Sequence, residues 1–65
     1  MLSAHELATL ILVKRSPEQV ELSCADLGAL HEKRLVRLVW ITSGLILPFV
    51  TPVGHALLLA LGQIH

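Results

Sequence analysis

Hydrophobic and polar positions divide the chain into a first half with helical spacing and a second half that is almost continuously apolar. In the first half, Leu7, Leu10 and Ile11 are spaced three and four residues apart, which places them on one face of a helix. The preceding Ser3-Ala4-His5-Glu6 is a capping box, in which the Ser hydroxyl accepts from the Glu backbone N–H and the Glu carboxylate accepts from the Ser N–H. The pattern predicts a helix from Ser3 to about Arg15.

Two further helix-start signals follow. Ser16-Pro17-Glu18-Gln19 has a serine at the N-cap and a proline at the first helical position, where its missing N–H costs nothing. The alternative for this segment is an extended one, because Gln19-Val20-Glu21-Leu22 alternates polar and apolar residues with period two. Ser23-Cys24-Ala25-Asp26 then starts a helix that buries Leu27 and Leu30 and runs to about Arg34. Residues 16–22 are left open between a short helix and a strand.

The next segment is typical of a β-hairpin. Leu35 to Thr42 is rich in Leu, Val, Trp and Ile, Ser43-Gly44 is a turn signal, and Leu45 to Val50 is a second β-favouring run. Because Pro48 cannot donate to a strand ladder, it has to lie on an edge or at a bulge.

Thr51-Pro52 is again an N-cap followed by a proline at the first helical position, so a final helix starts there. Gly54, in its first turn, lets this helix lie close to a neighbour. The fold class is therefore α+β, with one domain over residues 1–65: three amino-terminal helices, the second short or irregular, a two-stranded hairpin and a last helix. The expected core is Leu7, Leu10, Ile11, Leu27, Leu30, Leu35, Val36 and Leu57.

This order of elements is also that of a winged helix-turn-helix domain. Asp26-Leu27-Gly28-Ala29-Leu30-His31-Glu32-Lys33-Arg34-Leu35-Val36 resembles the stretch of MarR-like proteins in which the recognition helix runs into the first wing strand. Phe49-Val50-Thr51-Pro52-Val53-Gly54-His55-Ala56-Leu57-Leu58 is similar to the exit from the second wing strand into a Leu-rich helix. The resemblance covers nearly the whole chain, and it implies DNA binding by a transcriptional regulator and pairing through terminal helices.

The chain departs from that pattern at the residues that would touch DNA. Arg34 stands where such families usually have a glycine, so the helix exit is expected to use another conformation. The wing tip Thr42-Ser43-Gly44 has no charge, and Cys24, Asp26 and Ala29 of the reading helix are not side chains that read guanine or adenine. The candidate phosphate contacts are Lys14, Arg15, Lys33, Arg34 and Arg37, whose field is reduced by Glu18, Glu21, Asp26 and Glu32. We expect DNA binding to be weak and indifferent to sequence.

The distribution of charge favours association through the second half. Five Lys plus Arg balance five Asp plus Glu, all ten lie between Glu6 and Arg37, and His55 is the one ionisable side chain from Leu38 to Ile64. Alternation along the first strand puts Val36, Leu38, Trp40 and Thr42 on one face and Arg37, Val39, Ile41 and Ser43 on the other, so both faces are largely apolar. The last helix is apolar around most of its circumference. The expected partner is a protein, most simply a second copy, and the candidate interface residues are Val39, Ile41, Leu58, Leu61 and Ile64.

A membrane anchor is the alternative, because residues 38–64 exceed the ~20 residues that span a bilayer. Thr42-Ser43-Gly44, Pro48, Thr51-Pro52 and Gly54 oppose it, since they fall where a hairpin and a new helix need them. Nothing in the pattern indicates an enzyme, a cofactor, a metal site or a small-molecule substrate. His5-Glu6-Leu7-Ala8-Thr9 has Thr where a zinc-protease helix needs a second His. The lone Cys24 fits a reducing compartment, and we expect the protein in the cytoplasm.

Overall fold

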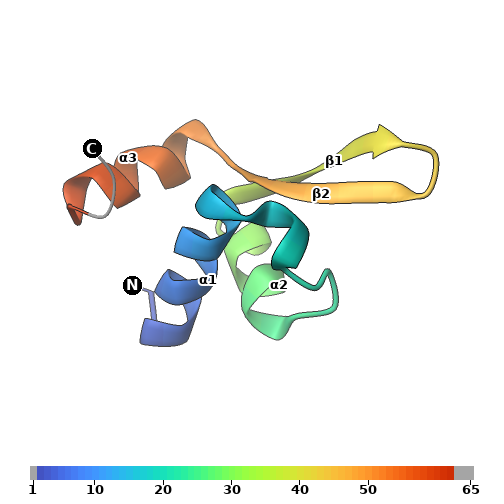
Figure 1. The fold of residues 1–65 in the computed structure, drawn as a ribbon. Helices are drawn as coiled ribbons and strands as arrows, with labels where there is room; N and C mark the ends of the chain where they lie inside the picture. The colour runs from blue at the N-terminus through green and yellow to red at the C-terminus, as the bar shows by residue number, and fades with distance from the viewer. Residues whose placement is uncertain (1, 63–65) are drawn as a thin grey trace.

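The computed structural model describes residues 2–62 and has α+β architecture. Its elements, in chain order, are α1 (Ala4–Arg15), the 3-10 turn η1 (Pro17–Gln19), α2 (Ala25–Glu32), β1 (Val36–Thr42), β2 (Leu45–Val50) and α3 (Pro52–Ala60) (Figure 1). β1 and β2 form a two-stranded antiparallel sheet.

The caps predicted for the first and last helices are confirmed. The Glu6 backbone N–H donates to Ser3 Oγ at 3.1 Å, and the Ser3 N–H donates to Glu6 Oε1 at 2.9 Å, so the capping box is complete. At the start of α3, the Gly54 N–H donates to Thr51 Oγ1 at 3.1 Å, and Pro52 occupies the first turn. Local side-chain chemistry therefore sets where both helices begin.

The expectation of three amino-terminal helices is wrong in number. In this segment the 3-10 turn covers residues 17–19, and the backbone at Val20 is already extended, with φ −92° and ψ 123°. The Ser16 side chain makes no capping hydrogen bond, and a helix this short gains too few hydrogen bonds to offset the cost of nucleation. Only α1 and α2 remain as α-helices before the hairpin.

The hairpin has the predicted turn. It also has a bulge, which the simple alternation of side chains between the two faces of β1 did not predict. Gly44 takes the left-handed φ of 83° at the two-residue turn. The register pairs Val36 with Val50, Leu38 with Pro48 and Trp40 with Ile46, but then Thr42 with Leu45, so Ile41 has no partner on β2. The expected alternation of β1 side chains therefore holds only as far as Trp40.

The core lies between α1, α2, the base of the hairpin and α3, and most of it was predicted. The buried apolar residues are Leu10, Val13, Leu27, Leu30, Leu35, Val36 and Leu58, and the predicted Leu7, Ile11 and Leu57 pack against them while partly buried. Val13 was missed. In α3 the placement of Leu58 at an interface was wrong, because Leu58 is 0% exposed and belongs to the core.

Gly54 explains which face of α3 turns inward. A Cβ on Gly54 would overlap the carbonyl oxygen of Leu35 and would lie 2.9 Å from Cγ1 of Val50. The close approach predicted for this glycine is thus confirmed, and it directs the Gly54 side of the helix toward the core. Leu58 follows four residues later on the same side and is buried for that reason.

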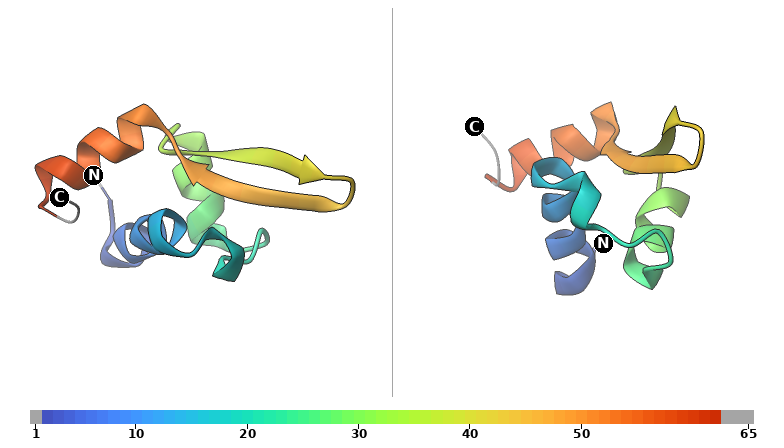
Figure 2. Two further views of the ribbon diagram at one scale, coloured as in Figure 1. Left: turned by 45° about the horizontal axis from the view of Figure 1, so that its top comes forward. Right: turned by 45° about the vertical axis from the view of Figure 1, so that its right-hand side comes forward.

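The hairpin projects beyond the helices. α1 and α2 pack at its base, whereas the turn extends past them and α3 lies at the other end of the molecule (Figures 1 and 2). Residues 38–62 thus contain two strands and a short helix in place of the continuous helix that a membrane anchor requires. Among the described residues, no helix has the length and apolar character needed to cross a bilayer.

Candidate association surface

Large apolar side chains are exposed mainly in the second half of the molecule. Five of them belong to the hairpin, and we call this set the hairpin surface: Leu38, Trp40, Ile41, Leu45 and Phe49. Three more, Val53, Leu59 and Leu61, lie on α3 or directly after it. Trp40 is the most exposed member, at 69%. Tryptophan has the largest apolar side chain, and it is seldom this exposed to solvent.

The strand register explains the exposure. Val36, Leu38 and Trp40 share one face of β1 with Pro48 and Ile46 of β2. At the base, Val36 is 2% exposed and belongs to the core cluster with residues of α1 and α2, whereas Leu38 is 42% exposed and Trp40 69%. On this face the β1 side is therefore more open than the β2 side, where Pro48 is buried and Ile46 is half-buried.

The predicted interface residues are spread over different environments. Val39 is half-buried on the opposite face, across from Leu47. Ile41, at the bulge, and Leu61, after α3, are exposed. Leu58 belongs to the core and has no exposed surface that a partner could contact. Ile64 lies outside the described residues.

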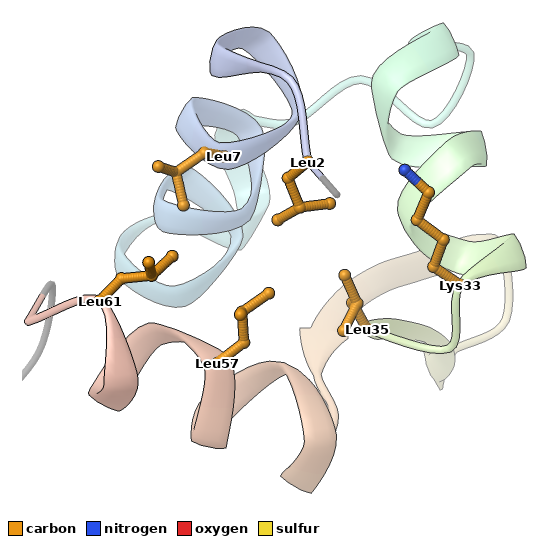
Figure 3. A pocket seen from close by; sticks show the side chains of 6 residues that line it. All are labelled: Leu2, Leu7, Lys33, Leu35, Leu57 and Leu61. Atoms are coloured by element: carbon orange, nitrogen blue, oxygen red, sulfur yellow. The ribbon is translucent and has the colours of Figure 1, made fainter.

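A second apolar feature is a pocket of about 460 Å³ between α1 and α3. Its lining is Leu2, Leu7, Lys33, Leu35, Leu57 and Leu61. Figure 3 shows the leucine side chains of α1 and α3 pointing toward one another across it, with Lys33 on the side of α2. Gly54 and Leu58 are the buried residues of α3, and Leu57 and the following Leu61 line the pocket on its α3 side.

Lys33 is fastened by an ion pair at the edge of this pocket. Its Nζ lies 3.1 Å from Oε2 and 3.2 Å from Oε1 of Glu6. The Ser3 backbone N–H and the Lys33 ammonium both stabilise the Glu6 carboxylate and hold its pKa below the ordinary value of 4.5. The pair joins the first turn of α1 to the end of α2.

The five candidate phosphate contacts do not form one patch. Lys33 is paired with Glu6, whereas Lys14 and Arg15 are exposed at the opposite end of α1, roughly 12 Å further along the helix axis. Arg37 is exposed on β1, across from Phe49. The positive charges of these side chains are therefore spread over separate parts of the molecule.

The helix exit at Arg34 corrects a prediction. Arg34 has φ 61°, the left-handed conformation that glycine adopts most readily, so the arginine takes the same backbone path that a glycine would. Its carbonyl oxygen accepts a hydrogen bond from the Thr51 hydroxyl at 2.7 Å, which holds the strained residue in place. The expectation of another conformation was wrong because tertiary contacts outweigh the preference of the side chain.

The residues of the reading helix add no binding chemistry. Cys24 is the N-cap of α2, and its side chain makes no capping hydrogen bond there. Within residues 2–62, no three His, Cys, Asp or Glu side chains gather in the manner of a metal site. Comparison with protein-family models, with curated proteins and with solved structures found no match for this chain.

Two properties of this surface were not visible in the sequence. The pocket depends on the angle of α3 relative to α1, which no local pattern reports. The exposure of Trp40 depends on which strand the helical elements cover, and α1 and η1 pack against β2. The one available signal was the absence of charge after Arg37.

Proposed function

We propose that this protein is a non-catalytic module of the winged-helix type that acts by associating with protein, most simply with a second copy of itself. The order of helices and strands and the MarR-like stretches support the winged-helix part. The hairpin surface carries the association part: five large apolar side chains are exposed on a projecting hairpin that contains one charge, Arg37. The cytoplasm is part of the same proposal, and the free Cys24 supports it.

A dimer interface of standard size would take a modest share of the molecular surface. The described residues expose 4478 Å², and a standard interface takes about 800 Å² from each partner, which is less than a fifth of it. Burying apolar surface contributes about 25 cal/mol per Å², against an association cost of about 4–15 kcal/mol. Several members of the hairpin surface must therefore be covered together.

Sedimentation over a range of protein concentrations, without detergent, tests the proposal. We expect a dimer that dissociates on dilution. Trp40→Lys should weaken it strongly, because an ammonium would replace the most exposed apolar side chain. Leu12→Lys, a matched change on the exposed side of α1, should leave it unchanged. A monomer at every concentration would contradict the proposal.

DNA binding is the alternative function, and its support is the exposure of Arg34 and Arg37 beside the hairpin. Against it stand the uncharged turn, the pairing of Lys33 with Glu6 and the separation of Lys14 and Arg15 from Lys33. We therefore propose weak, sequence-indifferent binding that salt removes. Titration into labelled duplex tests this, and a sub-micromolar complex at one specific sequence would establish the regulator in its place.

A further inference from the structure

The backbone of β1 has an open outer edge. The Thr51 N–H donates to the Leu35 carbonyl at 3.0 Å, so the Leu35–Thr51 pair belongs to the hydrogen-bonded series of the ladder. Because such pairs alternate in an antiparallel ladder, Arg37 and Val39 also direct their N–H and C=O groups toward β2. Val36, Leu38 and Trp40 direct theirs outward. Within residues 2–62, the backbone hydrogen bonds outside regular elements involve none of the residues of β1.

The outer edge of β2 is closed by comparison. By the same alternation, Ile46, Pro48 and Val50 face outward there, and Pro48 has no N–H to donate. α1 and η1 pack against β2, and α2 packs against β1, so the missing donor of Pro48 is what distinguishes the two edges. A further strand can therefore add to β1 but not to β2. β1 also lacks the usual protection of an edge strand, since it has no proline and a single charge, Arg37.

We propose, on the basis of the self-association above, that two copies join through their β1 edges, antiparallel about a two-fold axis at Val39. In this register Leu38 of one copy and Trp40 of the other form a hydrogen-bonded pair. The backbone groups of both residues are among those that face outward. The two Val39 residues lie opposite each other as a non-hydrogen-bonded pair. The result is a four-stranded antiparallel sheet that is continuous across the dimer.

Charge and side-chain packing favour this register. It sets Arg37 opposite Ile41 of the second copy, so the two Arg37 residues lie four positions apart, roughly 13 Å along the strands. A register centred on Leu38 would bring them to diagonal positions roughly 7–8 Å apart, where like charges repel. Centring on Val39 also places each Trp40 side chain over Leu38 of the second copy, which covers the two most exposed side chains on that face of β1.

The closed edge of β2 limits the assembly. After two β1 strands have paired, both outer strands of the new sheet are β2 strands, in which Pro48 interrupts the donors. Addition therefore stops at a dimer, as a two-fold interface requires, and does not continue into a fibre.

Cross-linking at the two-fold axis tests the proposal. Residues of a non-hydrogen-bonded antiparallel pair have Cα atoms about 4.5 Å apart, within the range that a disulfide bridges. In a Cys24→Ser background, Val39→Cys should oxidise to a covalent dimer in high yield. Leu59→Cys, which places a more exposed thiol on α3, should give little. A dimer by sedimentation that cross-links through Leu59→Cys and not through Val39→Cys would overturn this inference and leave the proposed function standing, whereas a monomer would overturn both.

Amide exchange provides a second test without any substitution. The amides of Arg37 and Val39 are bonded to β2 and should be protected at every protein concentration. The amides of Leu38 and Trp40 face outward and should gain protection only when the concentration exceeds the dissociation constant from sedimentation. Fast exchange of Leu38 and Trp40 in the dimer would contradict pairing through this edge.

Discussion

The hydroxyl of Thr51 donates to the carbonyl oxygen of Arg34 at 2.7 Å and accepts from the Gly54 N–H at 3.1 Å. One side chain thus caps α3 and also joins its start to the end of the segment that follows α2. The Thr51 N–H adds a third bond, to Leu35. The two ends of the hairpin are held together at this residue.

Thr51→Val should therefore destabilise the protein more than the loss of an ordinary cap. Valine keeps the shape of threonine but removes the bonds to Gly54 and Arg34, each worth about 1 kcal/mol. We expect the free energy of unfolding, measured with urea, to fall by about 2 kcal/mol. Thr42→Val, at the exposed end of β1, is the control and should be neutral. Equal effects of the two substitutions would show that the hydroxyl of Thr51 is not used.

Gly54→Ala and Gly28→Ala should act in opposite directions. A Cβ on Gly54 overlaps the Leu35 carbonyl, so α3 has to shift, and we expect a loss of about 1–3 kcal/mol. Around Gly28, within α2, a Cβ meets nothing within 4 Å, and alanine should stabilise by up to about 1 kcal/mol. Thermal unfolding of the two variants measures the difference. A stabilised Gly54→Ala variant would contradict the close approach of α3.

Arg34→Gly should stabilise the protein. The left-handed φ of 61° costs a residue with a Cβ about 1 kcal/mol, and glycine removes that cost. The gain should appear as a higher urea midpoint with an unchanged slope. Lys33→Gly is the matched control, because Lys33 has φ −81° and pairs with Glu6, so glycine there should destabilise. A destabilised Arg34→Gly variant would show that the arginine side chain makes a contact of its own.

Acid should weaken the junction between α1 and α2. The folded state lowers the pKa of Glu6, so its carboxylate contributes stability that is complete above the unfolded-state value, near 4.5, and is lost as the pH falls through the folded-state value. Urea unfolding at a series of pH values should show this decline, and Glu6→Gln should reduce it. The same decline in both proteins would assign it to other carboxylates.

The elements that were predictable from the sequence are those fixed by local chemistry. Ser3 with Glu6, and Thr51 with Pro52, determine helix starts through bonds to residues no more than three positions away. The inward face of α3 was not predictable in this way. Consecutive leucines at 57, 58 and 59 point in different directions around the helix, so the apolar pattern does not show which side is buried. The close approach of Gly54 to Leu35 determines which side faces inward, and these two residues are nineteen positions apart in the sequence.

The association surface was predictable only in outline. The lack of charge after Arg37 indicated that something apolar would be exposed, but not that Leu58 would be buried and Trp40 open. That outcome depends on tertiary packing, in which α1 and η1 lie against β2. The bulge at Ile41 is also a property of pairing, which the sequence of β1 alone does not contain.

The short connection between α1 and α2 bears on how the molecule opens. The 3-10 turn η1 has no side-chain cap, Leu22 beyond it is largely exposed, and Cys24 begins α2 without a capping bond. Segments with so few anchors unfold locally at a lower free energy than the whole protein. A protease should therefore cut the chain near Leu22 while the rest is still folded, and the nick would divide the molecule into α1 on one side and α2 with the hairpin and α3 on the other.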